Sequence, residues 1–383
     1  MVASEFDIII IGAGIAGVSA AAELAARGQR VLVLERESHP GFHSTGRSAA
    51  LFSEIYGAEP VRALSRASRG HFYAPAPGFC ETPLVKRRGA LHVASADQLP
   101  ALEAFAALPD VAGATRRLTS AEAITLCPIL REAAVAEAVF EPDAADVDVH
   151  ALHQAYLRML RLRGGQMLTD RPVETLLREQ GRWIVASGAE RFSAPVIVNA
   201  AGAWADVIGG YAGANPIGLQ PMRRTAVLVE PPMGMAVAGW PIVIDIDEQF
   251  YFKPDAGLLL LSPADETPVE PCDVQAEEWD VAVAIDRVET ATTLQVRTIK
   301  HRWAGLRSFV ADRIPVVGYD PIIEGFFWLA GQGGYGIQTS PALAEAAANL
   351  VLGRPLPASL IRFGVDARAL SPVRLTATAA CKN

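Results

Sequence analysis

The stretch that decides the fold is Phe6-Asp7-Ile8-Ile9-Ile10-Ile11-Gly12-Ala13-Gly14-Ile15-Ala16-Gly17, followed by an alanine-rich run to Ala26 and by Val31-Leu32-Val33-Leu34-Glu35. The β-branched residues before Gly12 predict a short buried strand, the alanine-rich run predicts a helix, and Val31–Leu34 predicts a second buried strand. Gly12 permits a tight turn, Gly14 lets a phosphate approach the backbone, and Gly17 lets helix and strand pack closely. The pattern therefore predicts a βαβ unit that binds a dinucleotide, with the phosphates at the helix N-terminus.

Polar residues after this unit supply further candidate contacts. Glu35 lies 23 residues after Gly12, where the acid of such a unit accepts hydrogen bonds from ribose hydroxyls. The loop that follows contains Ser44, Thr45, Arg47 and Ser48, whose hydroxyl and cationic groups suit a pyrophosphate. A solvated loop with a helix N-cap would have a similar composition, so the loop alone does not decide between the two.

Composition limits the class of protein. The 383 residues exceed what one core usually serves, so we expect two domains, and 51% hydrophobic with 20% charged residues is typical of a globular chain. A formal charge of −8 argues against a nucleic-acid partner. No pair among the four cysteines has metal-ligand spacing, so we predict reduced thiols and no metal site. The N-terminal apolar run lacks a basic segment and contains three glycines, so we expect neither a signal nor a membrane span, and a cytoplasmic location.

The remaining chain changes character several times. Residues 58–145 alternate helical pieces with proline-rich loops, and residues 215–310 are mostly typical of β-structure. The C-terminal part returns to α/β, with a strand at Gly325–Ala330 and a second glycine-rich turn at Gly331–Gly336. We expect Thr339-Ser340-Pro341 to cap a helix through about Leu352. This second turn and helix N-terminus would suit the far end of a long cofactor.

Four segments together resemble the D-amino-acid oxidase (DAO) superfamily of flavoenzymes: Gly12–Gly17, His43-Ser44-Thr45-Gly46-Arg47-Ser48, Asn199–Trp204 and Gly331–Gly336. Within it, Gly41–Ala50, Leu219–Arg224, Trp303–Phe309 and Gln332–Ser340 are most similar to bacterial FAD-dependent D-arginine dehydrogenase. The resemblance implies an α/β chain (α+β overall) with FAD as cofactor. It implies a Rossmann-like FAD-binding domain of residues 1–57, 146–214 and 311–383, and a β-rich substrate-binding domain of residues 58–145 and 215–310.

The resemblance also implies the site. Arg224, Arg307, Tyr56 and Tyr251 would bind the carboxylate of an amino-acid substrate, since the planar guanidinium of arginine binds a carboxylate bidentately, and the Gly334 carbonyl would accept from its amine. The cofactor-binding residues would be Gly12, Gly14, Ile15, Ala16, Gly17, Glu35, Arg36, Ser44, Thr45, Arg47, Ser48, Ala49, Ala50, Val173, Ala201, Gly202, Trp204, Gly331, Gly333, Gly334, Tyr335, Gly336 and Ile337.

Two positions depart from the arginine-specific pattern. Ala90 stands where that enzyme has a glutamate for the guanidinium, and Leu51 stands where it has a histidine. Ile242 and Ile244 would line the same pocket. A buried guanidinium without a carboxylate is costly, so these residues predict a neutral side chain. The basic run Lys86-Arg87-Arg88 leaves an acidic substrate as the alternative, although we interpret it as a solvated loop.

The sequence therefore predicts an FAD-dependent D-amino-acid dehydrogenase or oxidase, which forms a 2-oxo acid and ammonia through an imino acid. Oxygen or a quinone would accept the electrons. A quinone as acceptor would suit a protein that lies peripherally at the inner membrane. One alternative is a flavoenzyme for glycine, a secondary amine or a 2-hydroxy acid. Another is a non-catalytic dinucleotide-binding subunit, which would not need a carboxylate clamp.

Overall fold

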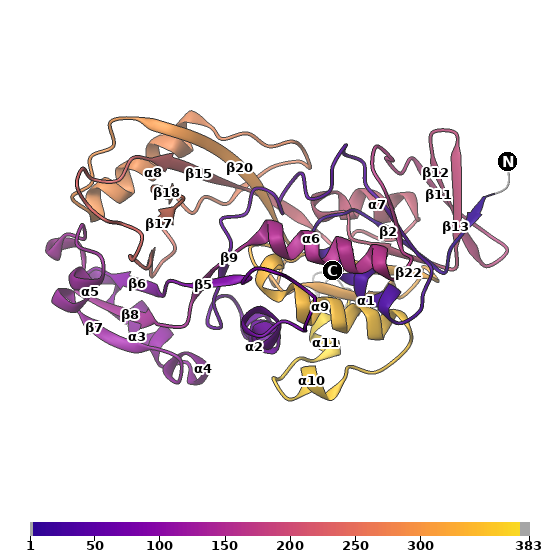
Figure 1. Ribbon diagram of the computed structural model, residues 1–383, viewed down its shortest axis with the longest axis horizontal. Helices are drawn as coiled ribbons and strands as arrows, with labels where there is room; N and C mark the ends of the chain where they lie inside the picture. The colour runs from indigo at the N-terminus through magenta and orange to yellow at the C-terminus, as the bar shows by residue number, and fades with distance from the viewer. Residues whose placement is uncertain (1–2, 376–383) are drawn as a thin grey trace, which may run out of the picture.

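The computed structural model describes residues 3–375 and contains a six-stranded sheet at one end of an elongated molecule (Figure 1). Its order is β10-β3-β2-β14-β22-β21, and every neighbouring pair is parallel except β21 with β22. The strands are β2 (Ile8–Ile11), β3 (Val31–Leu34), β10 (Gln166–Leu168), β14 (Val196–Asn199), β21 (Val316–Tyr319) and β22 (Phe326–Ala330). Both β2 and β3 are buried throughout, which explains their unbroken runs of aliphatic residues.

Helices cover one face of this sheet and a small, mostly antiparallel sheet covers the other (Figure 1). The helices are α1 (Ile15–Ala26), α6 (Val149–Leu162) and α9 (Gly336–Val351), and α1 packs against both of the others. The covering sheet has the order β1-β13-β12-β11, from β1 (Ser4–Glu5), β13 (Glu190–Ala194), β12 (Arg182–Ser187) and β11 (Thr175–Glu179). The predicted βαβ unit is confirmed as β2-α1-β3.

A larger, mostly antiparallel sheet forms the other end of the molecule (Figure 1). Its main path is β19-β15-β18-β17-β16-β6-β8-β7, and β20 pairs with β15. The strands are β6 (Ala90–Ala94), β7 (Arg116–Thr119), β8 (Glu137–Glu141), β15 (Gln220–Val229), β16 (Ile242–Asp245), β17 (Tyr251–Asp255), β18 (Leu258–Ser262), β19 (Thr267–Pro268) and β20 (Ile299–Phe309). Residues 58–145 and 215–310 both contribute, so the two segments with β-character share one sheet.

Two helices differ from the sequence prediction. The 215–310 segment contains a 14-residue helix, α8 (Glu278–Ala291), whose buried side chains pack on the larger sheet. Helix α9 begins at Gly336, so Thr339-Ser340-Pro341 lies inside it and caps nothing. Ser340 explains how the proline is tolerated there, because its Oγ donates to the Ile337 carbonyl, which a prolyl nitrogen cannot do.

The shorter elements connect these layers. They are β4 (Leu51–Phe52), α2 (Glu59–Tyr73), β5 (Val85–Arg87), η1 (Ala96–Gln98), α3 (Leu99–Ala106), α4 (Pro109–Ala112), α5 (Ser120–Leu126), η2 (Glu132–Ala134), β9 (Ala145–Val147), η3 (Gly202–Trp204), α7 (Ala205–Tyr211), α10 (Ala358–Ile361) and α11 (Ala367–Leu370). Strands β4, β9 and β5 form a small sheet of their own.

The division into two discontinuous domains stays a prediction, and α2 bears on its first boundary. The sequence prediction places this helix in the substrate-binding part, but it packs against α9 and shares the core of α1 and α6.

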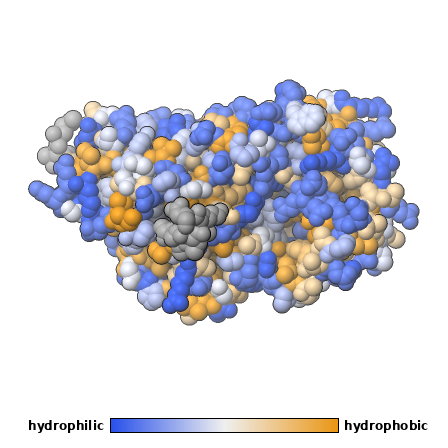
Figure 2. Space-filling model, turned by 180° about the vertical axis from the view of Figure 1, so that it is seen from behind, coloured by the Kyte–Doolittle hydropathy of each residue, from blue (hydrophilic) through white to orange (hydrophobic). Residues whose placement is uncertain are grey.

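The face seen from behind carries no single large apolar area among the described residues (Figure 2). Figure 2 shows hydrophilic residues over most of the view from behind, with hydrophobic side chains in separate groups. Across residues 3–375, no helix has both the length and the apolar character needed to cross a membrane. Three of the four cysteines lie in this part of the chain and all three are free thiols, while Cys381 lies outside it.

Candidate active site

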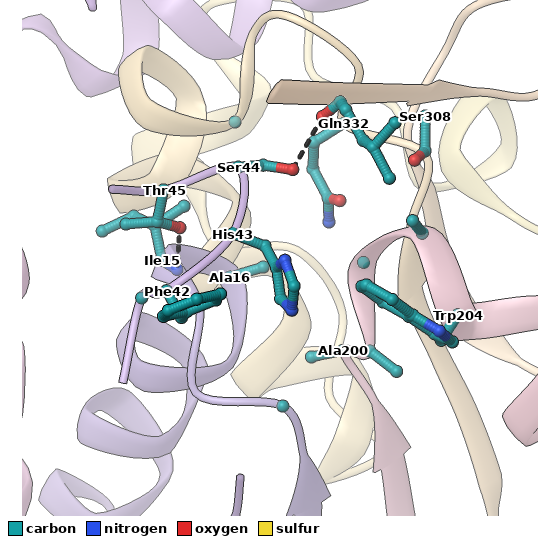
Figure 3. Close-up of a pocket in the computed structure, with 18 of the residues that line it drawn as sticks. Ile15, Ala16, Phe42, His43, Ser44, Thr45, Ala200, Trp204, Ser308 and Gln332 are labelled. Atoms are coloured by element: carbon teal, nitrogen blue, oxygen red, sulfur yellow. Dashed lines mark hydrogen bonds between the residues drawn. The ribbon is translucent and has the colours of Figure 1, made fainter. Parts of the chain in front are cut away.

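A cavity of about 590 Å³ lies where the two glycine-rich turns meet (Figure 3). It is lined by the β2–α1 turn, the loop of residues 41–49, the turn after β14 and the turn after β22. Most of the predicted cofactor residues line it: Gly12, Gly14, Ile15, Ala16, Glu35, Arg36, Ser44, Thr45, Arg47, Ser48, Ala49, Val173, Ala201, Gly202, Trp204, Gly331, Gly333, Gly334, Gly336 and Ile337. Gly17, Ala50 and Tyr335 do not: Ala50 lines a smaller neighbouring cavity, and Tyr335 is a buried ring against Tyr56.

The first turn has the geometry that its glycines predict. Gly12 has a φ of +102°, and a Cβ there would approach the Ala200 carbonyl oxygen to 2.4 Å. A Cβ on Gly17 would lie 1.9 Å from the Gly12 oxygen, which is the close helix–strand packing expected. At Gly14, only the Thr45 Oγ1 atom would be near, at 3.3 Å. The backbone at Gly14 is therefore open on the cavity side, as a phosphate requires.

Glu35 and Thr45 have structural roles at this turn. The carboxylate of Glu35 accepts from the Ala13 N–H at 2.8 Å and the Glu37 N–H at 3.0 Å, so it orders the turn. Thr45 Oγ1 accepts from the Ile15 N–H at 3.0 Å (Figure 3). Both residues line the cavity, and the ribose contact of Glu35 stays a prediction.

The pyrophosphate contact of Ser44 and Arg47 stays a prediction, and the protein itself already engages both side chains. Ser44 Oγ donates to the Leu306 carbonyl at 2.7 Å. Arg47 Nη1 donates to the Val274 carbonyl at 3.0 Å, and its other nitrogen pairs with Asp273. These side chains tie the loop to β20 and its surroundings, because the loop runs between the two ends of the molecule.

The second glycine turn completes the cavity. A Cβ on Gly333 would lie 1.9 Å from the Phe309 ring, so only glycine fits there. Gln332 lines the same cavity, and its buried Nε2 has no partner within residues 3–375 (Figure 3). Two backbone turns, each at the start of a long helix, and an amide donor without a partner in the described residues fit a long dinucleotide cofactor such as FAD.

A second cavity of about 70 Å³ adjoins the first. Arg224, Arg307, Tyr251 and Gly334 line both cavities, and Tyr56 lines the smaller one. The structure thus brings together all five predicted catalytic residues, although they come from distant parts of the chain. Such a junction would place a bound carboxylate and amine beside the large cavity.

The guanidinium groups of Arg224 and Arg307 differ in how many hydrogen-bond and ion-pair partners the protein already gives them. Arg224 Nε donates to the Asp265 carbonyl at 2.8 Å, and its Nη2 pairs with Glu266 at 3.1 Å. Arg307 Nη1 donates to the Tyr56 hydroxyl at 3.2 Å, and no carboxylate in the described part of the chain lies within ion-pair distance of it. Arg307 therefore has the greater capacity to bind an anion.

The phenols respond to these charges. Burial would raise the pKa of Tyr251, but the guanidinium groups of Arg307 and Arg224, with a hydrogen bond to Ser262, hold that pKa below its ordinary value. Burial raises the pKa of Tyr56 despite the nearby Arg307. A protonated phenol hydroxyl at either position can donate to a carboxylate.

The structure places three of the four predicted side-chain residues at the smaller cavity, and their contact with a substrate stays a prediction. Leu51, Ile242 and Ile244 line the smaller cavity. Ala90 lies behind that wall, fully buried in the same apolar cluster, and is paired in register with Glu141 on β8. A carboxylate at position 90 would therefore meet that of Glu141, which accepts from Ser53 Oγ at 2.6 Å and the Glu54 N–H at 2.9 Å.

The basic run does not reach the site. Lys86 and Arg87 are exposed on β5, and Arg88 is held by Asp146 and by the Trp240 carbonyl at 2.9 Å. The run is not a solvated loop, and neither cavity includes it.

Sequence reasoning missed two polar residues of the smaller cavity. His92 lies two residues after Ala90 on β6 and so faces the same way, a spacing that could have indicated it. Glu248 is exposed at the rim, in the tight turn after β16, and no pattern in the sequence pointed to it.

Comparison with known proteins gives consistent matches along most of the chain. The family model for FAD-dependent oxidoreductases (DAO) matches residues 7–350. The uncharacterised oxidoreductase YurR of Bacillus subtilis is 28% identical over 371 residues, which span 90% of this chain and 95% of that protein. Glycine oxidase of Geobacillus kaustophilus is 25% identical over 360 residues, which span 91% of this chain and 93% of that protein.

Solved structures agree in fold. That glycine oxidase superposes with a TM-score of 0.80, covering 95% of this chain and 99% of the other at 24% identity. L-Proline dehydrogenase from P. horikoshii superposes with a TM-score of 0.83, covering 98% and 99% at 22% identity. The narrower resemblance to D-arginine dehydrogenase stays a prediction, because these relatives carry other names.

Proposed function

We propose, since the chain belongs to the DAO family of FAD-dependent oxidoreductases, that it oxidises a neutral D-amino acid to the 2-oxo acid and ammonia. FAD is its cofactor. The observation that carries the proposal is Arg307, a cation without an acidic partner in the described chain, at the junction of the two cavities. A buried guanidinium in that state favours an anionic ligand group such as an α-carboxylate.

The proposed reaction removes two electrons and two protons from the substrate. The Cα–H bond breaks with its electron pair, the amine loses a proton, and a C=N bond forms. Water then adds to the imino acid and ammonia leaves, giving the 2-oxo acid. Bound FAD supplies the two-electron acceptor.

The protein's own groups bind and orient. Arg307, Tyr56 and Tyr251 fix the carboxylate, Arg224 adds a second guanidinium, and the Gly334 carbonyl accepts from the amine. His92 and Glu248 line the smaller cavity, but neither makes a hydrogen bond to a clamp residue within residues 3–375. The proposal therefore assigns a base role to no side chain, and the amine proton is lost to water.

The smaller cavity supports a neutral side chain. Leu51, Ile242 and Ile244 give a charged group nothing in return for its lost hydration, whereas they favour methyl and methylene groups by about 0.8 kcal/mol for each buried CH₂. We expect kcat/KM for D-leucine and D-methionine to exceed that for D-arginine and D-lysine.

A second candidate is oxidation of glycine or a small secondary amine. It is favoured by the relatives, which include glycine oxidase and the human mitochondrial sarcosine dehydrogenase, 26% identical over 262 residues. Such substrates would leave the side-chain cavity unfilled. A non-catalytic subunit is disfavoured because it has no use for a carboxylate clamp.

One screen separates these candidates. The purified holoenzyme is assayed with D- and L-amino acids, glycine, sarcosine and 2-hydroxy acids, under oxygen and then with an artificial quinone. Highest kcat/KM on a neutral D-amino acid supports the proposal. Highest kcat/KM on glycine or sarcosine selects the second candidate, and turnover of 2-hydroxy acids alone refutes both.

A further inference from the structure

The smaller cavity contains one polar side chain that no protein group satisfies. His92 on β6 lines this cavity, is 6% exposed, and makes no hydrogen bond within residues 3–375; its Nε2 is buried without a partner. A buried polar group left without a partner destabilises the protein, so a bound group that satisfied it would bind more tightly.

The sheet aligns His92 with the proposed carboxylate site. His92 pairs in register with Ile244 on β16, and Ile244 pairs with Tyr251 on β17, so the three lie in one row across the sheet. Neighbouring strands are about 4.8 Å apart, which sets the backbones of His92 and Tyr251 about 10 Å apart. A substrate held at Tyr251 and Arg307 would extend its side chain along this row, over Ile244.

The charge state of His92 limits what it can recognise. Burial lowers the pKa of His92 to about 4, so its ring is neutral at physiological pH. A neutral imidazole has one N–H donor and one nitrogen acceptor. It can therefore satisfy an amide or a hydroxyl, and it cannot offset the charge of a carboxylate or an ammonium group.

The other walls do not compete for this role. Ser53 Oγ already donates to Glu141, and Glu248 is exposed at the rim. Leu51, Ile242 and Ile244 are apolar. His92 is thus the group within the buried wall that remains available to a polar side chain.

The volume limits the size of that side chain. A cavity of about 150 Å³ accepts benzene, so the 70 Å³ here has room for about three heavy atoms. Beyond Cβ, the polar side chains of asparagine and threonine are no larger than this. Leucine and valine are their respective apolar isosteres and provide matched comparisons.

We infer that His92 is a specificity-determining residue, and that the substrate is an α-amino acid with a short, neutral side chain bearing an amide or hydroxyl group. This rests on the proposed function and narrows it from neutral side chains to polar ones. It also accounts for a histidine within an otherwise apolar wall.

The test compares isosteric pairs in the holoenzyme. We measure kcat/KM for asparagine against leucine and for threonine against valine, in both enantiomeric series. The same pairs are titrated against the oxidised enzyme, with the change in flavin absorbance reporting binding. The wild type should favour the polar member of each pair at least tenfold, because a site with an unpaired polar group rejects an apolar isostere.

Three variants locate the effect. His92→Leu should lower the asparagine-to-leucine ratio at least tenfold, whereas His92→Gln, which keeps a donor and an acceptor, should retain most of it. His71→Leu is the matched control, because His71 is also largely buried with a pKa lowered to about 4 but lies outside both cavities. It should leave the ratio unchanged.

The outcomes separate this inference from the proposed function. The enzyme could turn over amino acids with the same asparagine-to-leucine ratio of kcat/KM in the wild type and in His92→Leu. That result overturns the inference and leaves the proposed function standing. Absence of turnover with every amino acid refutes the function, and the binding ratios then decide the inference by the same criterion. If His92→Leu does not fold, the wild type decides: preference for leucine over asparagine overturns the inference.

Discussion

At the scale of single residues, the site depends on a guanidinium held ready for a ligand. Arg307 donates to Tyr56 and otherwise faces two cavities, whereas Arg224 is already paired with Glu266. We expect Arg307→Lys to raise KM about 10- to 100-fold, because the lysine loses the planar fork and a charge-assisted hydrogen bond is worth about 1.5–3 kcal/mol. FAD content should stay unchanged, as read from the flavin-to-protein absorbance ratio.

The control for this prediction is Arg223→Lys. Arg223 is buried on the opposite face of β15, bound to Glu277 and Asp280, and lines neither cavity. Its replacement should change KM by no more than about threefold. That change is smaller than the one expected from losing a charge-assisted hydrogen bond to the substrate. A wild-type KM in Arg307→Lys would show that the carboxylate binds elsewhere.

Glu141 gives a residue-scale prediction for pH. Burial raises the pKa of Glu141 to about 7, against an opposing effect of its hydrogen bonds from Ser53 and Glu54. Between the unfolded value of 4.5 and about 7, the folded state therefore binds more protons than the unfolded state, so this residue's contribution to stability falls as pH rises. Above pH 7 the cost of the buried charge is fully present.

Replacing Glu141 with glutamine removes that charge and keeps both hydrogen bonds possible. The difference in unfolding free energy between Glu141→Gln and the wild type should shift in favour of the variant from pH 5 to pH 8. The shift should be about 3 kcal/mol at most. Urea unfolding at the two pH values measures this difference. The exposed Glu132 supplies a control in Glu132→Gln, and an equal effect of pH on both variants would contradict the assignment.

At the scale of elements, the β2-α1 turn depends on space as well as conformation. Gly12 and Gly28 both have positive φ, but a Cβ would meet the Ala200 oxygen at 2.4 Å in the first case and nothing within 4 Å in the second. Gly28→Ala should therefore cost about 1–2 kcal/mol in unfolding free energy and keep FAD. Gly12→Ala should cost more and lose FAD on gel filtration, and equal behaviour of the two would refute the packing argument.

The same scale shows what sequence patterns can and cannot predict. The strands β2, β3 and β22 follow from buried aliphatic runs, and the glycine turns follow from their spacing. Helix α8 was missed because its apolar residues, which include Val281, Ala284 and Val288, pack on a sheet assembled from two distant segments. The start of α9 was misplaced because Ser340 replaces the bond that Pro341 cannot make.

For the site, the sequence predicts which residues take part more readily than it predicts which other residues they contact. The family resemblance placed the arginines and tyrosines of the clamp, and all of them line the smaller cavity. It could not show that Arg47 is engaged by Val274 and Asp273, or that Glu141 occupies the space beside Ala90. These contacts join segments more than 50 residues apart, and only the assembled sheets bring them together.

At the scale of the whole molecule, the large cavity lies between the two sheets. Gly12 and Gly333 reach it from the six-stranded end, whereas Arg224, Tyr251 and Leu306 reach it from the larger sheet. A cofactor bound there contacts both ends at once. Because FAD would bind the folded chain and not the unfolded one, it should stabilise the entire molecule.

We therefore predict that removing FAD lowers Tm, and that adding FAD restores it in a concentration-dependent way. At a free concentration of 100 times Kd, the expected gain in unfolding free energy is about 2.7 kcal/mol. Calorimetry across a series of FAD concentrations measures this change in Tm, with NAD as the matched ligand that lacks the flavin.

The same experiment tests whether FAD joins the two ends of the molecule. If it does, the apoprotein should unfold in two transitions that merge into one as FAD is added, since the bound cofactor would then couple the two sheets. A single transition whose Tm is the same at every FAD concentration would show that the cavity does not hold the cofactor.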